Sequence, residues 1–156
     1  MPTIVIGADT APGRAIVEAM HSESPEVRAF VTNPEAAAAL KAAGTKVAVG
    51  DLTDESHVAA AARGTFCAIL VGEAASDDRA RAFAGSVTAV VTGWASALKE
   101  AGTTRAIWVG DPLSSLDTLA GAVSEVRTVE TTGRDLADVV RDVLAADAAH
   151  IGAVET

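Results

Sequence analysis

Five short stretches of the chain are rich in β-branched and apolar residues, and alanine-rich segments with helical spacing separate them. The five stretches are residues 3–6, 27–32, 46–49, 66–71 and 105–109. Four of them are almost continuously apolar instead of alternating, and that pattern is typical of strands buried on both faces of a parallel sheet. The pattern therefore predicts five parallel strands.

The segments between these strands have the length and spacing of crossover helices. They are residues 13–21, 34–43, 55–62 and 78–101. Residues at their ends support the boundaries, because Asn33 and Asp54 suit helix N-caps and Gly44 and Gly102 suit C-caps. Regular alternation of strand and helix predicts a Rossmann-like, doubly wound parallel sheet in a three-layer α/β/α arrangement.

The last third of the chain is less regular. A loop at residues 111–115 is expected to lead into a helix that ends near Ala120, and residues 125–130 are expected to form a sixth strand. Residues 134–146 have an amphipathic helical pattern, whose apolar face carries Leu136, Val139, Val140, Val143 and Leu144. Residues 149–156 are expected to fray. Residues 1–156 are interpreted as a single domain with a sheet of five or six strands.

Composition narrows the classes of function. Acidic residues outnumber basic ones by 21 to 12, which gives a formal net charge of −9, and the basic residues are scattered singly. Such a surface repels phosphate backbones, so no nucleic acid is expected as a partner. No apolar stretch approaches the roughly 20 residues that a membrane helix needs. The sequence therefore predicts a soluble, cytoplasmic protein that does not bind a membrane.

The cysteine and the histidines give no sign of redox or metal chemistry. Cys67, the one cysteine, lies inside an apolar run and is expected to be a buried, inert thiol. The three histidines lack metal-ligand spacing, so no metal site is expected.

A turn with two glycines joins the first predicted strand to the first helix, in the run Gly7-Ala8-Asp9-Thr10-Ala11-Pro12-Gly13. The first glycine allows a sharp turn and the second lets helix and strand approach closely. The helix N-terminus that follows attracts an anion. On spacing alone, a phosphate-binding turn and a plain turn without a ligand are both open.

The turn resembles the Gly-Ala-Thr-Gly-x-x-Gly turn of the atypical short-chain dehydrogenases of the NmrA-like group. Residues 27–34, Val-Arg-Ala-Phe-Val-Thr-Asn-Pro, resemble the second strand of that family, and residues 43–52 resemble its third strand with a Gly-Asp-Leu end. The resemblance covers residues 3–110, and it is weaker for residues 133–144. It implies a protein whose partner is a dinucleotide, either NADP or NAD.

The resemblance also implies which residues hold the dinucleotide. It assigns the diphosphate to Gly7, Thr10, Ala11, Pro12 and Gly13, the adenine to Asp51 and Leu52, and the adenosine ribose and middle of the cofactor to Val71 and Gly72. Asp9, Arg14, Thr32 and Asn33 complete the candidate cofactor site. A plain strand-end cap is the alternative role for Asp51.

Two departures from the family pattern leave the choice of cofactor open. Thr10 replaces the middle glycine and narrows the approach to the diphosphate, although its hydroxyl is able to donate a hydrogen bond. Thr32 stands where the family often has an arginine for the 2′-phosphate of NADP, and no acidic residue ends the second strand as an NAD site prefers. Arg14 is a candidate for that phosphate and equally for a solvated helix residue.

The chain contains no tyrosine. The Tyr-x-x-x-Lys chemistry of ordinary short-chain dehydrogenases is therefore impossible, and the catalytic residues stay unknown. NAD(P) binding is the leading prediction, with NAD(P)H-dependent reduction of a small-molecule acceptor such as a flavin or quinone as its enzymatic form. A non-catalytic dinucleotide-sensing regulator and a degenerate dimeric Rossmann module are the alternatives.

The predicted helix at residues 78–101 carries an apolar stripe of Phe83, Val87, Val90, Val91, Trp94 and Leu98. Related short-chain dehydrogenases dimerise through the equivalent helix. A homodimer through the 78–101 helix, with Trp94 at the interface, is therefore one interpretation. A stripe that belongs wholly to the core is the other.

Overall fold

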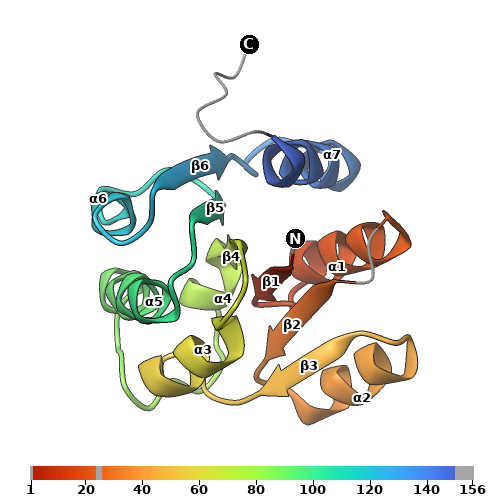
Figure 1. The fold of residues 1–156 in the computed structure, drawn as a ribbon, viewed down its shortest axis with the longest axis horizontal. Coiled ribbons are helices and arrows are strands. Elements are labelled where there is room, and N and C mark those ends of the chain that lie inside the picture. The colour runs from red at the N-terminus through yellow and green to blue at the C-terminus, as the bar shows by residue number, and fades with distance from the viewer. Residues whose placement is uncertain (1, 24–25, 150–156) are drawn as a thin grey trace.

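Six parallel strands form one sheet in the order β3-β2-β1-β4-β5-β6 in the computed structural model, which describes residues 2–23 and 26–149 (Figure 1). The strands are β1 (Thr3–Ile6), β2 (Val27–Val31), β3 (Lys46–Val49), β4 (Cys67–Val71), β5 (Arg105–Val109) and β6 (Glu125–Val129). The helices are α1 (Ala11–Glu23), α2 (Pro34–Ala42), α3 (Glu55–Ala62), α4 (Gly72–Ser76), α5 (Val87–Ala101), α6 (Leu116–Ala120) and α7 (Leu136–Ala148). Each strand agrees with the span predicted from the sequence to within one residue at either end.

Helices cover both faces of the sheet, as the doubly wound prediction requires. Helices α1, α2 and α7 lie on one face, and α3, α4, α5 and α6 lie on the other (Figure 1). The strand order reverses between β1 and β4, so the chain moves outward from the middle of the sheet in both directions. In such sheets ligands bind at the carboxyl ends of the strands beside this switch point.

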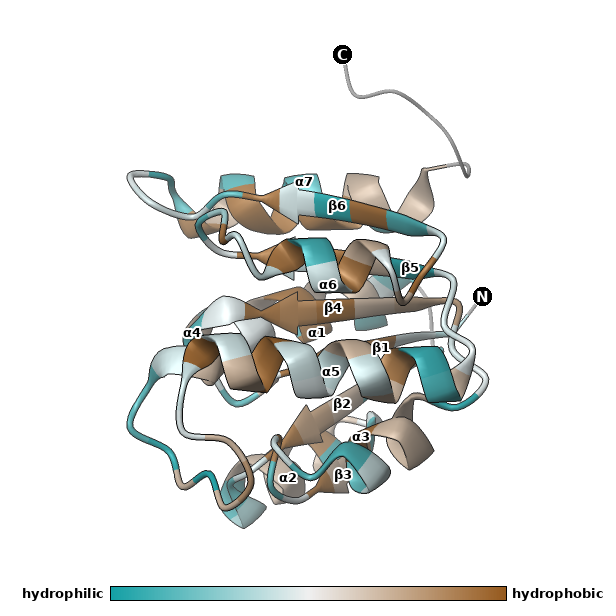
Figure 2. Ribbon diagram, turned by 90° about the vertical axis from the view of Figure 1, so that its left-hand side faces the viewer, coloured by the Kyte–Doolittle hydropathy of each residue, from teal (hydrophilic) through white to brown (hydrophobic). Residues whose placement is uncertain are grey.

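The strands are buried on both faces, which explains their continuous apolar pattern. In β1, Ile4 and Ile6 belong to the core under α5, whereas Val5 between them belongs to the core under α1. All three side chains are at most 1% exposed. Figure 2 shows the central strands as the most hydrophobic part of the ribbon. Cys67 is also fully buried, and burial raises the pKa of its thiol well above the ordinary value, in line with an inert side chain.

Helix ends follow the capping chemistry that the sequence predicted. The Asn33 side chain accepts a hydrogen bond from the N–H of Glu35 at the start of α2, and the Asp54 side chain accepts one from the N–H of His57 in α3. Gly102 ends α5 in the left-handed conformation with φ 76°, a conformation that glycine adopts without a steric penalty.

The prediction of one helix over residues 78–101 is wrong. The regular helix α5 begins only at Val87, and a separate short helix, α4, precedes an irregular segment at residues 77–86. The Ser86 side chain accepts a hydrogen bond from the N–H of Ala89 and so caps α5 nine residues later than expected. The carboxylate of Asp77 binds the guanidinium groups of Arg79 and Arg81, which holds the 77–86 segment in a non-helical path.

The apolar stripe of α5 belongs to the core. Trp94 is 1% exposed, and its indole N–H donates to the carbonyl of Leu52 at 2.9 Å. Phe83 is not part of the stripe, because it lies in the 77–86 segment and is 68% exposed. A dimer interface centred on Trp94 is therefore excluded by the burial of this side chain within the protomer.

The last helix, α7, begins two residues later than predicted. Val139 and Val143 are buried against the sheet as expected, whereas Leu136 is 44% exposed at the start of the helix. The expected fraying beyond Ala149 concerns residues 150–156, which lie outside the described part of the chain. Within residues 2–23 and 26–149, no helix combines the length and the apolar character needed to cross a membrane.

A buried arginine ties the last two strands to the end of α7. Arg105 on β5 is 0% exposed, and its guanidinium donates to the carboxylate of Glu125 on β6. The same group donates to the backbone carbonyls of Ala146, Asp147 and Ala149 at 2.7–2.9 Å. Because a buried charge is stable only when it is paired and hydrogen-bonded, these partners make Arg105 the centre of a buried polar network.

Glu125 should make the fold sensitive to acid. Burial raises the pKa of its carboxyl, but hydrogen bonds from Arg127 and Arg105 outweigh burial, so the pKa lies below the ordinary value of 4.5. A depressed pKa in the folded state stabilises the fold above about pH 4.5, and this stabilisation is lost as the pH falls through the folded-state pKa. We expect Glu125→Gln to lower the free energy of unfolding at pH 7 and to flatten its decline between about pH 5 and 3.

Urea unfolding followed by circular dichroism at a series of pH values measures this effect. Glu100→Gln, at the exposed end of α5, is the control and should follow the unchanged protein. An acid limb that is the same for Glu125→Gln and the unchanged protein would contradict the prediction.

Candidate functional site

The turn between β1 and α1 is held by contacts that tolerate only glycine at its two ends. Gly7 has φ 92°, and a Cβ atom on it would lie 2.7 Å from the Cβ of Ala74. A Cβ atom on Gly13 would lie 2.1 Å from the carbonyl oxygen of Gly7 and 2.9 Å from the Cα of Ala8. These approaches bring the N-terminus of α1 directly against the end of β1, at the switch point of the sheet.

Thr10 closes this turn from the inside. Its hydroxyl donates to the carbonyl of Gly7 at 2.7 Å and accepts from the N–H of Gly13 at 3.0 Å, and the residue is 4% exposed. The hydroxyl therefore does not face a ligand. Pro12 has no N–H, so within the described chain Ala11 keeps the one N–H in the first three positions of α1 that has no partner.

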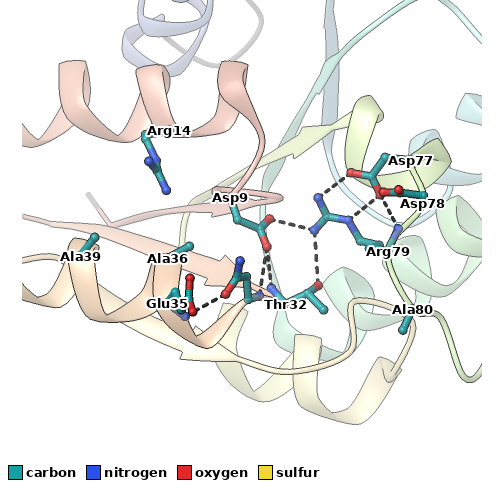
Figure 3. A pocket seen from close by; sticks show the side chains of 11 residues that line it. Asp9, Arg14, Thr32, Glu35, Ala36, Ala39, Asp77, Asp78, Arg79 and Ala80 are labelled. Carbon is teal, nitrogen blue, oxygen red and sulfur yellow. Dashed lines mark hydrogen bonds and ion pairs between the residues drawn. The ribbon is translucent and has the colours of Figure 1, made fainter.

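Asp9 binds the start of the segment that follows β2. One oxygen of its carboxylate accepts from the N–H groups of Thr32 at 2.9 Å and Asn33 at 3.2 Å. The other oxygen accepts from the guanidinium of Arg79 at 2.8 Å (Figure 3). The carboxylate is only 7% exposed. Asp9, Thr32 and Asn33 were all candidate site residues, and the structure brings them together.

Arg79 is the member of this cluster that the sequence analysis missed. It belongs to the 77–86 segment, and it also binds both oxygens of Asp77 and the hydroxyl of Thr32. Burial alone would lower the pKa of Arg79, but the hydrogen bonds to Asp77 and Asp9 outweigh it and raise the pKa. Burial likewise raises the pKa of Asp77, and the hydrogen bonds from Arg79 overcome this and lower it. Both groups are therefore charged at neutral pH.

Asp51 holds the middle of the 77–86 segment. Its carboxylate accepts from the N–H and the hydroxyl of Thr53 and from the N–H of Ala82 at 2.6 Å. Burial raises the pKa of Asp51, and these hydrogen bonds bring it below the ordinary value. Leu52 does not reach the site, because its side chain is 1% exposed and lies in the core under α5. Asp51 thus acts as a tether in this structure, and Leu52 acts as a core residue.

An open pocket of about 570 Å³ lies between α1, α2 and the 77–86 segment. Its lining comprises Asp9, Arg14, Thr32, Asn33, Glu35, Ala36, Ala39, Asp77, Asp78, Arg79 and Ala80, and we name it the Asp9 pocket. Figure 3 shows Arg14 extending from α1 toward the space between Asp9 and α2. Within the described chain Arg14 has no hydrogen-bond or ion-pair partner, so its charge is available to an anion in the pocket.

A second pocket, of about 190 Å³, lies on the other side of the turn at the ends of β4 and β5. It is lined by Pro12, Val71, Glu73, Val109, Gly110, Thr131, Arg134, Leu136 and Val139, and we name it the Leu136 pocket. Val71 lines it, whereas Gly72 does not, and a Cβ atom on Gly72 would be 2.8 Å from the ring of Trp108. The exposure of Leu136 follows from this position, since the side chain forms part of the pocket rim.

The described residues show no group of histidine, cysteine and carboxylate side chains that is suited to hold a metal ion. The two pockets instead offer hydrogen-bond donors, carboxylates, three arginines and an apolar surface along one edge of the sheet. This arrangement suits an elongated ligand with an anionic middle and a flat, partly apolar end.

Several solved structures share the fold of this chain, and three of them are described as reductases or oxidoreductases. The triphenylmethane reductase of Citrobacter sp., solved with NADP(H), has a TM-score of 0.70 at 14% identity, over 84% of this chain and 49% of that one. The anaerobilin reductase ChuY of Escherichia coli O157:H7 has a TM-score of 0.65 at 18% identity, over 96% and 91%. The NADPH-dependent quinone oxidoreductase QOR2 of Escherichia coli, complexed with NADPH, has a TM-score of 0.59 at 21% identity, over 94% and 45%.

This chain therefore spans about half the length of the triphenylmethane reductase and quinone oxidoreductase chains, and nearly all of ChuY. These likenesses establish the Rossmann-like fold. No curated protein sequence matches the chain. The model of one protein family, described as NAD(P)H-binding, matches residues 7–150, which include the turn, both pockets and all strands but β1. The chain belongs to this NAD(P)H-binding family.

Proposed function

We propose that the protein is an NAD(P)H-dependent reductase of a small, flat acceptor such as a flavin or quinone, and that it belongs to the NmrA-like group of atypical short-chain dehydrogenases. The observation that carries the proposal is the pair of pockets on either side of the Gly7–Gly13 turn. One pocket is polar and charged, and the other is mainly apolar. A dinucleotide that crosses the turn would have its adenosine half in the Asp9 pocket and its nicotinamide near the Leu136 pocket.

The residues around the turn fit the diphosphate of such a cofactor. Ala11 offers its unpaired N–H, and the α1 dipole favours negative charge at this point. Arg14 adds a guanidinium that has no competing carboxylate partner within the described chain. Because Thr10 uses the N–H of Gly13, Arg14 supplies the charge-assisted contact that replaces this missing backbone donor.

The Leu136 pocket supports the reductase form of the proposal. Val71, Val109, Leu136 and Val139 give it apolar walls, and Arg134 contributes a cation at the rim. Part of that charge is balanced by the ion pair of Arg134 with Asp142. A bound dihydronicotinamide would supply a hydride, and an acceptor that carries its own redox centre needs mainly orientation and exclusion of water from the protein. This chemistry does not require a tyrosine.

Nucleotide titration tests binding first. NADH or NADPH should bind with a dissociation constant below 1 mM, the threshold at which we set this test, and the reduced nicotinamide fluorescence reports it. Oxidation of the bound nucleotide by menadione, benzoquinone and FMN then tests turnover. Failure of both nucleotides to bind would overturn the proposal.

Leu136 should affect turnover more than cofactor binding. We expect Leu136→Ser to lower kcat/KM for the quinone about five- to tenfold, because part of the apolar contact with the acceptor is lost. The dissociation constant of the nucleotide should stay within about twofold, since the side chain lies away from the diphosphate contacts. Phe83→Ser is the matched control, because Phe83 is exposed and apolar but does not line the Leu136 pocket. Equal losses in both variants would contradict this assignment.

Dinucleotide sensing without turnover is the second candidate. It is favoured by the absence of tyrosine from the chain and by the internal tethers that hold the 77–86 segment over the end of β3. Binding of a nucleotide without oxidation by any acceptor would select this candidate over the reductase.

We further propose that residues 1–156 form one cytoplasmic, NAD(P)-binding domain. We also propose a homodimer through α5, but with a different contact surface on the helix. Since Trp94 is buried, the contact would use the outward side of the helix, where Thr88, Thr92 and Ser96 are exposed.

A further inference from the structure

We propose that the Asp9 carboxylate makes this site select NADH over NADPH, because it occupies the anion-binding corner that a 2′-phosphate would need. The inference rests on the proposed function, since it concerns the adenosine end of the same cofactor site. The residue that selects between NAD and NADP is usually sought at the end of the second strand. Asp9 lies instead in the turn after β1, and no motif in the sequence gives it this role.

We use the word corner for the group of donors around the Asp9 carboxylate. These donors resemble an anion-binding site, and the anion that fills it is the Asp9 carboxylate itself. The consecutive N–H groups of Thr32 and Asn33 converge on one carboxylate oxygen of Asp9, and the Arg79 guanidinium binds the other (Figure 3). Successive backbone N–H groups together with an arginine are the donors that proteins use for phosphate. The Asp9 side chain is 7% exposed, and it already satisfies these donors.

Few donors remain for a phosphate. A guanidinium has five N–H donors, and Arg79 uses four of them on Asp77, Asp9 and Thr32. A carboxylate has about four acceptor positions, and Asp9 uses three. The corner therefore has little to offer a phosphate but retains one acceptor position, which suits a ribose hydroxyl.

The negative charge of the Asp9 pocket also disfavours a 2′-phosphate. Its lining includes four carboxylates, of Asp9, Glu35, Asp77 and Asp78, against the two guanidinium groups of Arg14 and Arg79. A 2′-phosphate would bring about two further negative charges into this surplus. A neutral 2′-hydroxyl avoids that repulsion and donates to the carboxylate.

Arg14 is the one cation that could reverse this preference, and the experiment distinguishes its two roles. If Arg14 binds the diphosphate, which both nucleotides share, Arg14→Met weakens NADH and NADPH by the same factor. If Arg14 instead binds a 2′-phosphate, the variant weakens NADPH alone, and that result would overturn the inference.

The decisive measurement is the ratio of the dissociation constants of NADH and NADPH, obtained by nicotinamide fluorescence. We expect the unchanged protein to bind NADH at least about tenfold more tightly, the size of one charge-assisted hydrogen bond. Asp9→Ser should empty the corner and release Arg79, which shifts the ratio toward NADPH by about 10- to 100-fold. Asp9→Asn, which keeps an acceptor for the two N–H groups, should shift it in the same direction by a smaller factor.

Asp78→Asn is the matched control, because Asp78 lines the same pocket and is exposed but does not bind Arg79 or the two N–H groups. It should change the ratio less than about threefold. An unchanged protein that binds NADPH as tightly as NADH, or an Asp9→Asn variant that folds and keeps the original ratio, would overturn the inference while leaving the proposed function intact. Absence of binding for both nucleotides would overturn both.

Discussion

Gly13→Ala is expected to reduce dinucleotide affinity by about 100-fold and to destabilise the fold by about 1–3 kcal/mol. The added Cβ atom would lie 2.1 Å from the carbonyl oxygen of Gly7 and 2.8 Å from the hydroxyl of Thr10. Both neighbours lie within the turn itself, and the nearest one is backbone, so α1 has to move away from β1. That movement would displace the N–H of Ala11 and the side chain of Arg14 from the diphosphate.

Stability and affinity have to be measured separately for this variant. Urea unfolding gives the first, and fluorescence titration with NADH, at a temperature where the variant is folded, gives the second. Gly121→Ala is the control, since Gly121 has φ −82° and its added Cβ atom would meet only the carbonyl of Thr118 at 3.7 Å. A folded Gly13→Ala protein with unchanged affinity would show that the turn is not the cofactor site.

Arg105→Met is expected to lower the free energy of unfolding by about 3–5 kcal/mol, the usual cost of breaking a buried ion pair. The substitution removes one of the two arginines that bind the Glu125 carboxylate, leaving Arg127, and it removes the donors for three backbone carbonyls near the end of α7. Methionine fills much of the volume of the arginine stem, so lost polar contacts dominate the effect over cavity formation.

Thermal and urea unfolding measure this loss. Arg141→Met provides the comparison, because Arg141 pairs with Asp138 and Asp142 on the surface and its side chain is 67% exposed. Exposed pairs of this kind contribute about 0–1 kcal/mol. If the two variants were equally stable, Arg105 would not be the centre of the network described above.

The strands and caps could be predicted from the sequence because their causes are local. The continuous apolar run at residues 105–109 predicts a strand buried on both faces, and Asn33 before Pro34 predicts a helix start from side-chain chemistry alone. The predicted helix does not form over residues 78–86, and this difference has a local and a distant cause. Ser86 is a residue type that favours helix N-caps, so the start of α5 is written in the local sequence. The pairing of Arg79 with Asp9, by contrast, joins residues that are 70 positions apart in the chain.

The sequence predicts which residues belong to the candidate site, but it does not predict which partners their side chains bind. The resemblance identified Asp9, Thr32 and Asp51 as site residues, and all three carry side chains at the carboxyl edge of the sheet. It gave no indication that their hydrogen bonds would be made within the protein. Whether a polar side chain faces a ligand or a neighbouring loop depends on tertiary contacts, and in this chain the 77–86 segment decides it.

The Arg105 network also has a consequence for how the chain is made. Arg105 leaves the ribosome before every hydrogen-bond acceptor of its guanidinium, because Glu125 follows 20 residues later and Ala149 follows 44 residues later. During synthesis β5 therefore carries a charged side chain that cannot yet be buried against the sheet. The part of the sheet built from β1 to β4 does not depend on these acceptors and can assemble first, as N-terminal parts of growing chains generally do. Docking of β5, β6 and α7 is then expected as one late, concerted event that starts only when residues 146–149 have emerged.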